Sequence, residues 1–143
     1  MTTVLFYEKP GCINNTRQKA LLKAAGHRVI ARNLLLEAWT CDRLRPFFAD
    51  LSVTQWFNTA APAITTGLVV PRWLDADLAL ELMVLDPLLI RRPLMQVGNQ
   101  HRVGFDPEAI DQWIGLKTTQ PLPLAPSLSE DLETCPHAAL RGR

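Results

Sequence analysis

A short apolar strand that runs through a Pro-Gly turn into a helix opens the chain and limits what it can fold into. Thr3–Tyr7 is β-branched and aromatic and predicts a buried strand. Glu8–Gly11 ends that strand, and a helix is predicted over Thr16–Ala25, closed by Gly26. His27–Arg32 predicts a second strand. The two strands are therefore expected to be parallel and joined by a right-handed crossover.

The predicted first helix has a polar start and one apolar face. Asn14 or Asn15 is the expected N-cap, because a side-chain oxygen there can accept a hydrogen bond from the first turn. Three- and four-residue spacing selects the residues expected to face the core, which are Ala20, Leu21, Ala24 and Ala25.

The rest of the ordered part predicts inserted helices and then a hairpin. Helices are expected from Thr40 or Asp42 to Phe48, from Ser52 to Phe57, over Ala76–Leu85 behind Asp75, and from Asp106 onward. Pro93–Val97 and His101–Phe105 flank Gly98-Asn99, a pair that suits a tight turn. The order βαβ, inserted helices, ββα predicts an α/β protein with a thioredoxin-like fold.

The C-terminal segment differs from the rest in composition. Residues 1–116 predict one thioredoxin-like domain, whereas residues 117–143 combine prolines with Ser, Thr, Glu and Asp and show no sustained period. Such a segment buries too little apolar surface to order itself, so a Pro-rich, flexible tail is predicted for residues 117–143.

Bulk properties exclude several function classes. The formal net charge is +1, and no basic block is interleaved with aromatic residues, so neither nucleic acid nor a membrane is expected as a partner. The N-terminus lacks the pattern of a secretory signal, which makes a cytoplasmic location the expectation. Three widely spaced cysteines make no disulfide framework and no zinc knuckle.

Cys12 is the residue with the most promising chemistry. It lies where the predicted strand and turn meet the helix, and unpaired N–H groups and the helix dipole favour a thiolate at a helix N-terminus. Lys9 and Arg17 add positive charge nearby. Such a setting lowers a cysteine pKa from about 8.5 toward neutrality. The alternative is a buried packing cysteine, which is the interpretation preferred for Cys41.

Several motifs together resemble one family. They are Phe6–Cys12, the helix start Thr16–Leu21, the leucine-rich Leu88–Leu94 with its Arg-Pro end, and Gly104–Asp106 after the hairpin. Over Thr3–Leu116 the chain resembles the arsenate reductase (ArsC)/Spx-like family of thioredoxin-fold proteins. Cys12–Arg17 and Ala38–Thr40 further resemble its nitrogenase-associated (NifO-like) branch, which implies a role and a protein partner in nitrogen fixation.

The resemblance implies a site. Cys12 matches the family's catalytic cysteine, Arg92 matches an arginine that binds the oxyanion substrate, and Pro93 matches a proline that is cis in the thioredoxin fold. Asn15 and Arg17, which follow Cys12 in the predicted helix start, complete the expected substrate- or anion-binding set. No metal is expected, since Cys135 and its near neighbour His137 provide only two ligands.

The chain also departs from the family. Arsenate reductases place two further anion-binding arginines where this chain has Asn58 and Phe105, which argues against tight arsenate binding. Spx-type proteins have a second cysteine where this chain has Asn15, so no disulfide can form within the motif. Turnover is therefore expected to use an outside thiol.

Two functions remain open. The first is a glutathione- or glutaredoxin-linked thiol oxidoreductase with Cys12 as nucleophile, with glutathione as co-substrate and no bound cofactor. The second is a non-enzymatic accessory or regulatory protein of nitrogen fixation with a degenerate arsenate reductase site.

Overall fold

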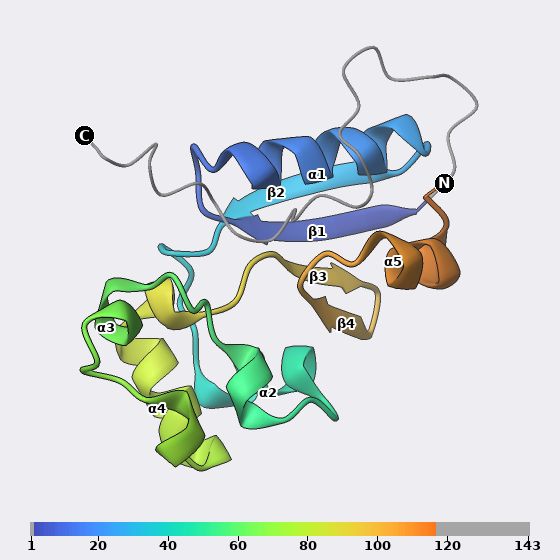
Figure 1. The fold of residues 1–143 in the computed structure, drawn as a ribbon. Helices are drawn as coiled ribbons and strands as arrows, with labels where there is room; N and C mark the ends of the chain where they lie inside the picture. The colour runs from blue at the N-terminus through green and yellow to red at the C-terminus, as the bar shows by residue number, and fades with distance from the viewer. Residues whose placement is uncertain (1, 117–143) are drawn as a thin grey trace.

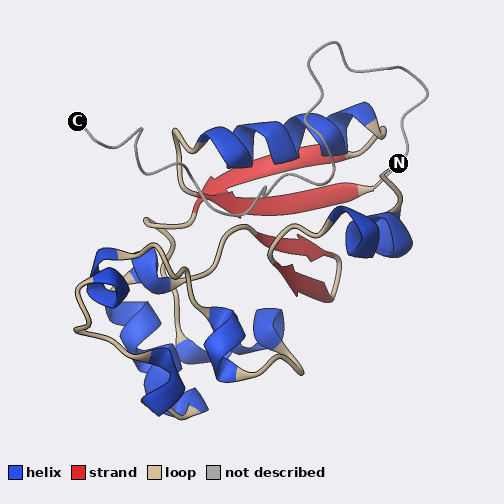
Figure 2. Cartoon of the chain, in the orientation of Figure 1, coloured by secondary structure: helices blue, strands red, loops and turns tan. Residues whose placement is uncertain are grey.

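A central four-stranded sheet organises the protein. The computed structural model describes residues 2–116, so the predicted tail at 117–143, with Cys135 and His137, lies outside the described residues. The strands are β1 (Thr3–Glu8), β2 (Arg28–Asn33), β3 (Leu94–Val97) and β4 (Gln100–Val103), in the order β2-β1-β3-β4. β1 pairs parallel with β2 and antiparallel with β3, as Figure 2 shows. The predicted α/β class and the parallel first pair are confirmed.

Helix α1 (Ile13–Ala24) makes the crossover between β1 and β2. Its C-terminal end is as predicted: Gly26 has φ +92°, and His27 N–H donates to the Leu22 carbonyl at 3.1 Å, which closes the last turn. Its start was predicted wrongly. The helix begins at Ile13 with Cys12 as N-cap, so Asn14 and Asn15 lie inside the first turn.

The buried face of α1 also differs from the predicted one. Ala20 is exposed, and Ala24 and Ala25 are only half-buried. The residues that face the sheet are Asn14, Asn15, Gln18, Leu21 and Leu22. Three of these five side chains are amides, which hydrophobic periodicity alone assigns to the surface.

The other helices are arranged in two groups. They are α2 (Cys41–Phe48), α3 (Pro62–Thr65), α4 (Ala76–Leu85) and α5 (Pro107–Ile114), with 3-10 turns at Val53–Trp56, Pro71–Trp73 and Pro87–Leu89. Helices α2 to α4 gather at one side of the sheet, apart from α1 and α5 (Figure 1). Of the two candidate caps of α2, Thr40 is the N-cap and Asp42 lies in the first turn. Thr40 and the predicted caps Asp75 and Asp106 accept hydrogen bonds from their helices. None of the described helices is long and apolar enough to cross a membrane.

Strand alternation divides the interior into two cores. Val4 and Phe6 of β1 pack with Leu22 of α1 and Ile110 of α5. Tyr7 of the same strand faces the other way and joins the core formed with α2 and α4. Because neighbouring side chains of a strand point to opposite faces, β1 contributes to both cores.

The connection from β2 to α2 is held by an aromatic and ionic cluster. The indole N–H of Trp39 donates to the Leu34 carbonyl at 2.8 Å, and its ring lies 5.1 Å from that of Tyr7. Glu37 pairs with Arg32 at 3.2 Å and with Arg43 at 3.1 Å. Partial burial would raise the pKa of Glu37, but hydrogen bonds and charge from both arginines outweigh it, so the pKa lies below its ordinary value.

Replacing Glu37 with Gln therefore removes a pH-dependent contribution to stability. A carboxylate whose pKa is lowered by folding stabilises the folded state at pH values above its ordinary pKa of 4.5. This stabilisation is lost as the pH falls through the folded-state pKa of Glu37. Because both arginines are partly exposed, Glu37→Gln should cost up to about 1 kcal/mol at pH 7 and less near pH 3. Urea unfolding at both pH values measures this. Glu81→Gln, at an exposed position of α4, is the control, and an equal effect at both pH values would contradict the prediction.

Candidate functional site

Cys12 occupies the turn between β1 and α1. Its N–H donates to the Lys9 carbonyl at 3.1 Å, and its own carbonyl accepts from the Thr16 N–H at 3.1 Å as the first bond of the helix. Gly11 has φ +86°, a backbone conformation that favours glycine, and this brings the chain into the helix at Cys12. The sulfur-bearing residue thus lies at the helix N-terminus, where backbone N–H groups favour an anion.

Cys12 and Cys41 differ in their state. Cys12 is 5% exposed and is disulfide-bonded. Cys41, the other cysteine among the described residues, is a half-buried free thiol at the start of α2.

Side chains of α1 hold the loop that carries Cys12. Asn15 accepts the Lys9 N–H at 3.1 Å and donates to Gln18 at 2.8 Å, and both amides are completely buried. Lys19 pairs with Glu8, the last residue of β1, at 2.9 Å. Asn15, which is part of the predicted substrate- or anion-binding set, thus makes its hydrogen bonds in this structure with the loop and with Gln18.

Pro93 lies beside this loop at the same end of the sheet. Strand pairing places Tyr7 opposite Leu94, so Pro93 falls next to Glu8, where β1 ends. The Arg92–Pro93 bond is cis, as the resemblance implies. The Pro93 carbonyl accepts the Gly104 N–H at 2.9 Å, so that neighbouring chain segment holds it.

Arg92 is a buried cation that has no counter-ion among residues 2–116. It is 5% exposed, and its Nε makes no hydrogen bond. Burial lowers the pKa of Arg92 from its ordinary value, because desolvation disfavours the charged form. Arginine nevertheless stays protonated in proteins. A buried charge that lacks a partner is costly, and an anionic ligand would compensate it.

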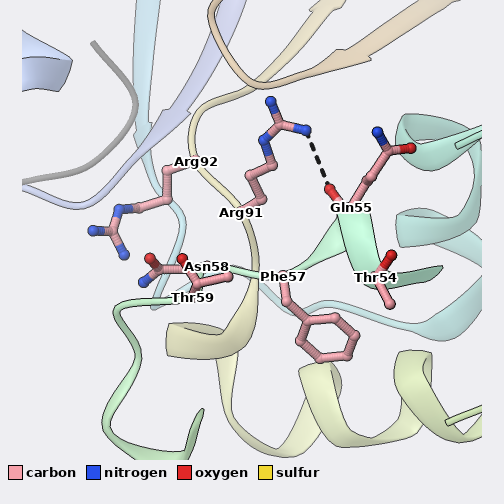
Figure 3. A pocket seen from close by; sticks show the side chains of 7 residues that line it. All are labelled: Thr54, Gln55, Phe57, Asn58, Thr59, Arg91 and Arg92. Carbon is pink, nitrogen blue, oxygen red and sulfur yellow. Dashed lines mark hydrogen bonds between the residues drawn. The ribbon is translucent and has the colours of Figure 1, made fainter. Parts of the chain in front are cut away.

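Arg92 lines a pocket of about 230 Å³. Its walls are Thr54, Gln55, Phe57, Asn58, Thr59, Arg91 and Arg92. Figure 3 shows the side chains of Arg92, Asn58 and Thr59 on one side, while Arg91 points the other way. Arg91 donates to the Gln55 carbonyl at 3.2 Å. The two arginines therefore have different surroundings, and Arg92 is the one buried beside Asn58 and Thr59.

Positions 58 and 105, where arsenate reductases have arginine, make other contacts in this structure. Asn58 donates to the Leu88 carbonyl and accepts the Ala60 N–H, both at 3.2 Å, so its side chain joins loops at the pocket wall. Phe105 is 2% exposed and packs in the core shared by α1 and α5. Arg92 is thus the buried arginine at this site within the described residues.

Of the predicted site residues, Arg92 lines the pocket, whereas Cys12, Asn15, Arg17 and Pro93 do not. Arg17 is exposed on α1. Gln18 was not predicted, because a polar residue in a helix carries no sequence signal of burial. Thr54 and Thr59 were also missed, since they line the pocket only through tertiary packing. No cluster of three metal-ligating side chains occurs within residues 2–116.

Comparisons with known proteins agree with this architecture. A sequence model of the ArsC family matches residues 9–113. An uncharacterized 15.7 kDa protein in the draG 3' region of Rhodospirillum rubrum is 52% identical over 143 residues, which cover 100% of this chain and 94% of that protein.

Two solved structures share the thioredoxin-like fold. The arsenate reductase from Vibrio cholerae matches with a TM-score of 0.63 and 20% identity, over 81% of this chain and 98% of that chain. An arsenate reductase (ArsC) related protein from Brucella melitensis matches with a TM-score of 0.59 and 22% identity, over 80% of this chain and 96% of that chain. At these low identities the similarity establishes the fold and does not establish the chemistry of the site.

Replacing Asn15 with Ala should loosen the Cys12 loop. The change leaves the Lys9 N–H and the Gln18 amide without their partner, and such unpaired buried groups cost about 1–3 kcal/mol. Urea unfolding would measure the loss, and amide exchange at Lys9 should accelerate. Lys23→Ala, at an exposed position of the same helix, is the control. Equal stability and unchanged exchange at Lys9 would show that the amide does not position the loop.

Proposed function

The chain belongs to the ArsC family, and we propose that it is a thiol oxidoreductase in which Cys12 is the nucleophile and Arg92 binds an anionic group of the substrate. The resemblance matches Cys12 to the family's catalytic cysteine, but this chain has its own set of charged residues at the site. The substrate is therefore argued from those residues.

Buried Arg92 is the observation that carries the proposal. Its Nε is buried without a hydrogen bond, and the residue lines a pocket and precedes the cis proline beside the Cys12 loop. A protein that needed this position only for packing would be more stable with an apolar side chain there. A ligand carboxylate, by contrast, can accept two parallel hydrogen bonds from a guanidinium.

The proposed reaction is thiol–disulfide exchange. In the reduced protein the Cys12 thiolate attacks one sulfur of a disulfide substrate, R–S–S–R′. A new Cys12–S–S–R bond forms, the old S–S bond breaks, and R′–S⁻ leaves and takes up a proton. An outside thiol, R–SH, then attacks the mixed disulfide, which returns Cys12 to the thiol and releases R–S–S–R.

The residues favour a carboxylate-bearing thiol such as glutathione over a tetrahedral oxyanion. A tetrahedral oxyanion needs several donors around it, and here Asn58 is occupied by backbone groups while Phe105 is in the core. A single arginine suffices for one carboxylate. We therefore propose glutathione or glutaredoxin as the reaction partner, with no bound cofactor, in the reducing cytoplasm.

The cellular setting that we propose is nitrogen fixation. This rests on the resemblance of Cys12–Arg17 and Ala38–Thr40 to the nitrogenase-associated branch. The alternative function is an accessory or regulatory protein in the same process that binds a protein partner without catalysis. The absence of arginine at positions 58 and 105 favours that alternative.

Replacing Arg92 with Gln should slow attack on an anionic disulfide selectively. A hydrogen bond to a charged group contributes about 1.5–3 kcal/mol, so the rate with oxidised glutathione should fall about 10- to 100-fold. The rate with the uncharged bis(2-hydroxyethyl) disulfide should change little. Loss of the Cys12 thiol in the reduced protein, followed by mass spectrometry, gives both rates.

Two control variants make the kinetic result specific. Cys12→Ser should abolish the reaction, and Arg45→Gln should leave both rates unchanged, because it removes an equal charge from the exposed pair with Asp77. Equal slowing of the two substrates by Arg92→Gln would count against an anion-binding role, since a damaged fold affects both alike.

Restoring the gene to a deletion strain separates catalysis from accessory binding. In a nitrogen-fixing bacterium that carries the gene, Cys12→Ser should fail to restore nitrogenase activity if thiol chemistry is required. The wild-type gene and Arg45→Gln should both restore it. Full restoration by Cys12→Ser would favour the accessory function.

A further inference from the structure

The charges that line the Arg92 pocket limit which end of a substrate it can bind. Arg91 and Arg92 are both among the lining residues, and the described residues that form this lining include no Asp or Glu. We propose that the pocket binds the glycine carboxylate of a glutathione disulfide, and that Thr59 is the second residue that binds this carboxylate. The inference rests on the proposed function and names the part of the substrate that the pocket recognises.

The pocket is separate from the nucleophile. Neither Cys12 nor a residue of its loop lines the pocket, although Arg92 directly precedes the proline beside that loop. A group bound in the pocket is therefore not the group that reacts. Its volume of about 230 Å³ is several times the share of about 30 Å³ that one water molecule has in the liquid, so the pocket has room for the end of a peptide arm.

Charge distinguishes the two kinds of carboxylate that glutathione carries. The γ-glutamyl carboxylate shares its carbon atom with an ammonium group, whereas the glycine carboxylate is attached to a neutral amide. An ammonium group in this pocket would meet two guanidinium groups and no lining carboxylate that could pair with it. Like charges brought together in this way lower affinity. The pocket therefore favours the glycine end.

A turn fixed by Asn58 presents Thr59 at the pocket. The Asn58 carbonyl accepts the Ala61 N–H at 3.0 Å, and its side-chain oxygen accepts the Ala60 N–H at 3.2 Å. The Asn58 N–H donates to the Leu89 carbonyl at 2.8 Å, which ties the turn to the chain segment before Arg92. A side-chain bond of this kind stabilises a tight turn. Thr59 is at its corner, exposed and in the pocket lining.

Arg92 and Thr59 offer donors of two kinds to one carboxylate. Arg92 is buried with its Nε unpaired, and Figure 3 shows its side chain on the same side of the pocket as Thr59. A carboxylate has about four lone-pair sites, and two parallel bonds from a guanidinium use two of them. The Thr59 hydroxyl can donate to a third. One charged donor and one neutral donor suit a group with a single negative charge.

Reaction of the reduced full-length protein with two disulfides tests the proposal. One is oxidised glutathione, and the other is the same molecule with both glycine carboxylates converted to ethyl esters. Loss of the Cys12 thiol, followed by mass spectrometry, gives both rates. The wild-type protein should react about 10- to 100-fold faster with the unmodified disulfide, and Arg92→Gln should remove this preference. Thr59→Val, which replaces the hydroxyl with a methyl group, should reduce the preference about 3- to 10-fold.

The outcomes separate this proposal from the proposed function. Thr59→Ser keeps the hydroxyl and should keep the preference, as should Thr65→Val, a matched control at an exposed position of α3. Equal wild-type rates with the two disulfides, while Arg92→Gln still slows both, would overturn the assignment of the glycine carboxylate and leave Cys12 as the nucleophile. An unchanged preference in Thr59→Val would overturn the role of Thr59. A Cys12 thiol that reacts with neither disulfide would overturn both proposals.

Discussion

Every feature of the site depends on the position of β1 in the centre of the sheet. β1 pairs with β2 on one side and with β3 on the other, and its side chains enter both cores. Where β1 ends, the turn to Cys12 begins, and the pairing with β3 brings Pro93 to the same end. The buried strand thus joins two segments about 80 residues apart, Cys12 and Arg92-Pro93, through backbone hydrogen bonds that tolerate little movement.

The proposed function depends most on Arg92, which is buried and whose Nε makes no hydrogen bond. Side-chain packing alone would be served better by an apolar residue, since burying a guanidinium without a partner costs free energy that the fold must recover elsewhere. Proteins concentrate such costs at functional sites. Asn58 is bonded to backbone groups and Phe105 packs in the core, so in the proposed function it is Arg92 that binds the anion.

The first helix shows how far sequence patterns reach. Its end at Gly26 was predicted from the sequence, because the residue that follows a helix often takes a left-handed conformation, which glycine adopts readily. Its start and its buried face were not. Asn15 and Gln18 are buried because their amides bond to Lys9 and to each other, and these partners are brought together only by the turn before the helix. Hydrophobic periodicity has no means of detecting a polar side chain that is hydrogen-bonded in the interior, as Asn15 is, or one that is buried with an unpaired atom, as Gln18 is at Nε2.

Residue order and local chemistry were enough to determine the α/β class, the parallel first strand pair, the helix caps at Asp75 and Asp106, and the place of Cys12 at a helix start. These features depend on neighbours in sequence, so a single chain displays them. Tertiary structure alone decided that Arg92 is buried with its Nε unpaired, that Arg91 donates to the Gln55 carbonyl, and which residues line the pocket. Burial and pairing depend on which distant segments meet, and that is settled only when the two cores pack against the sheet.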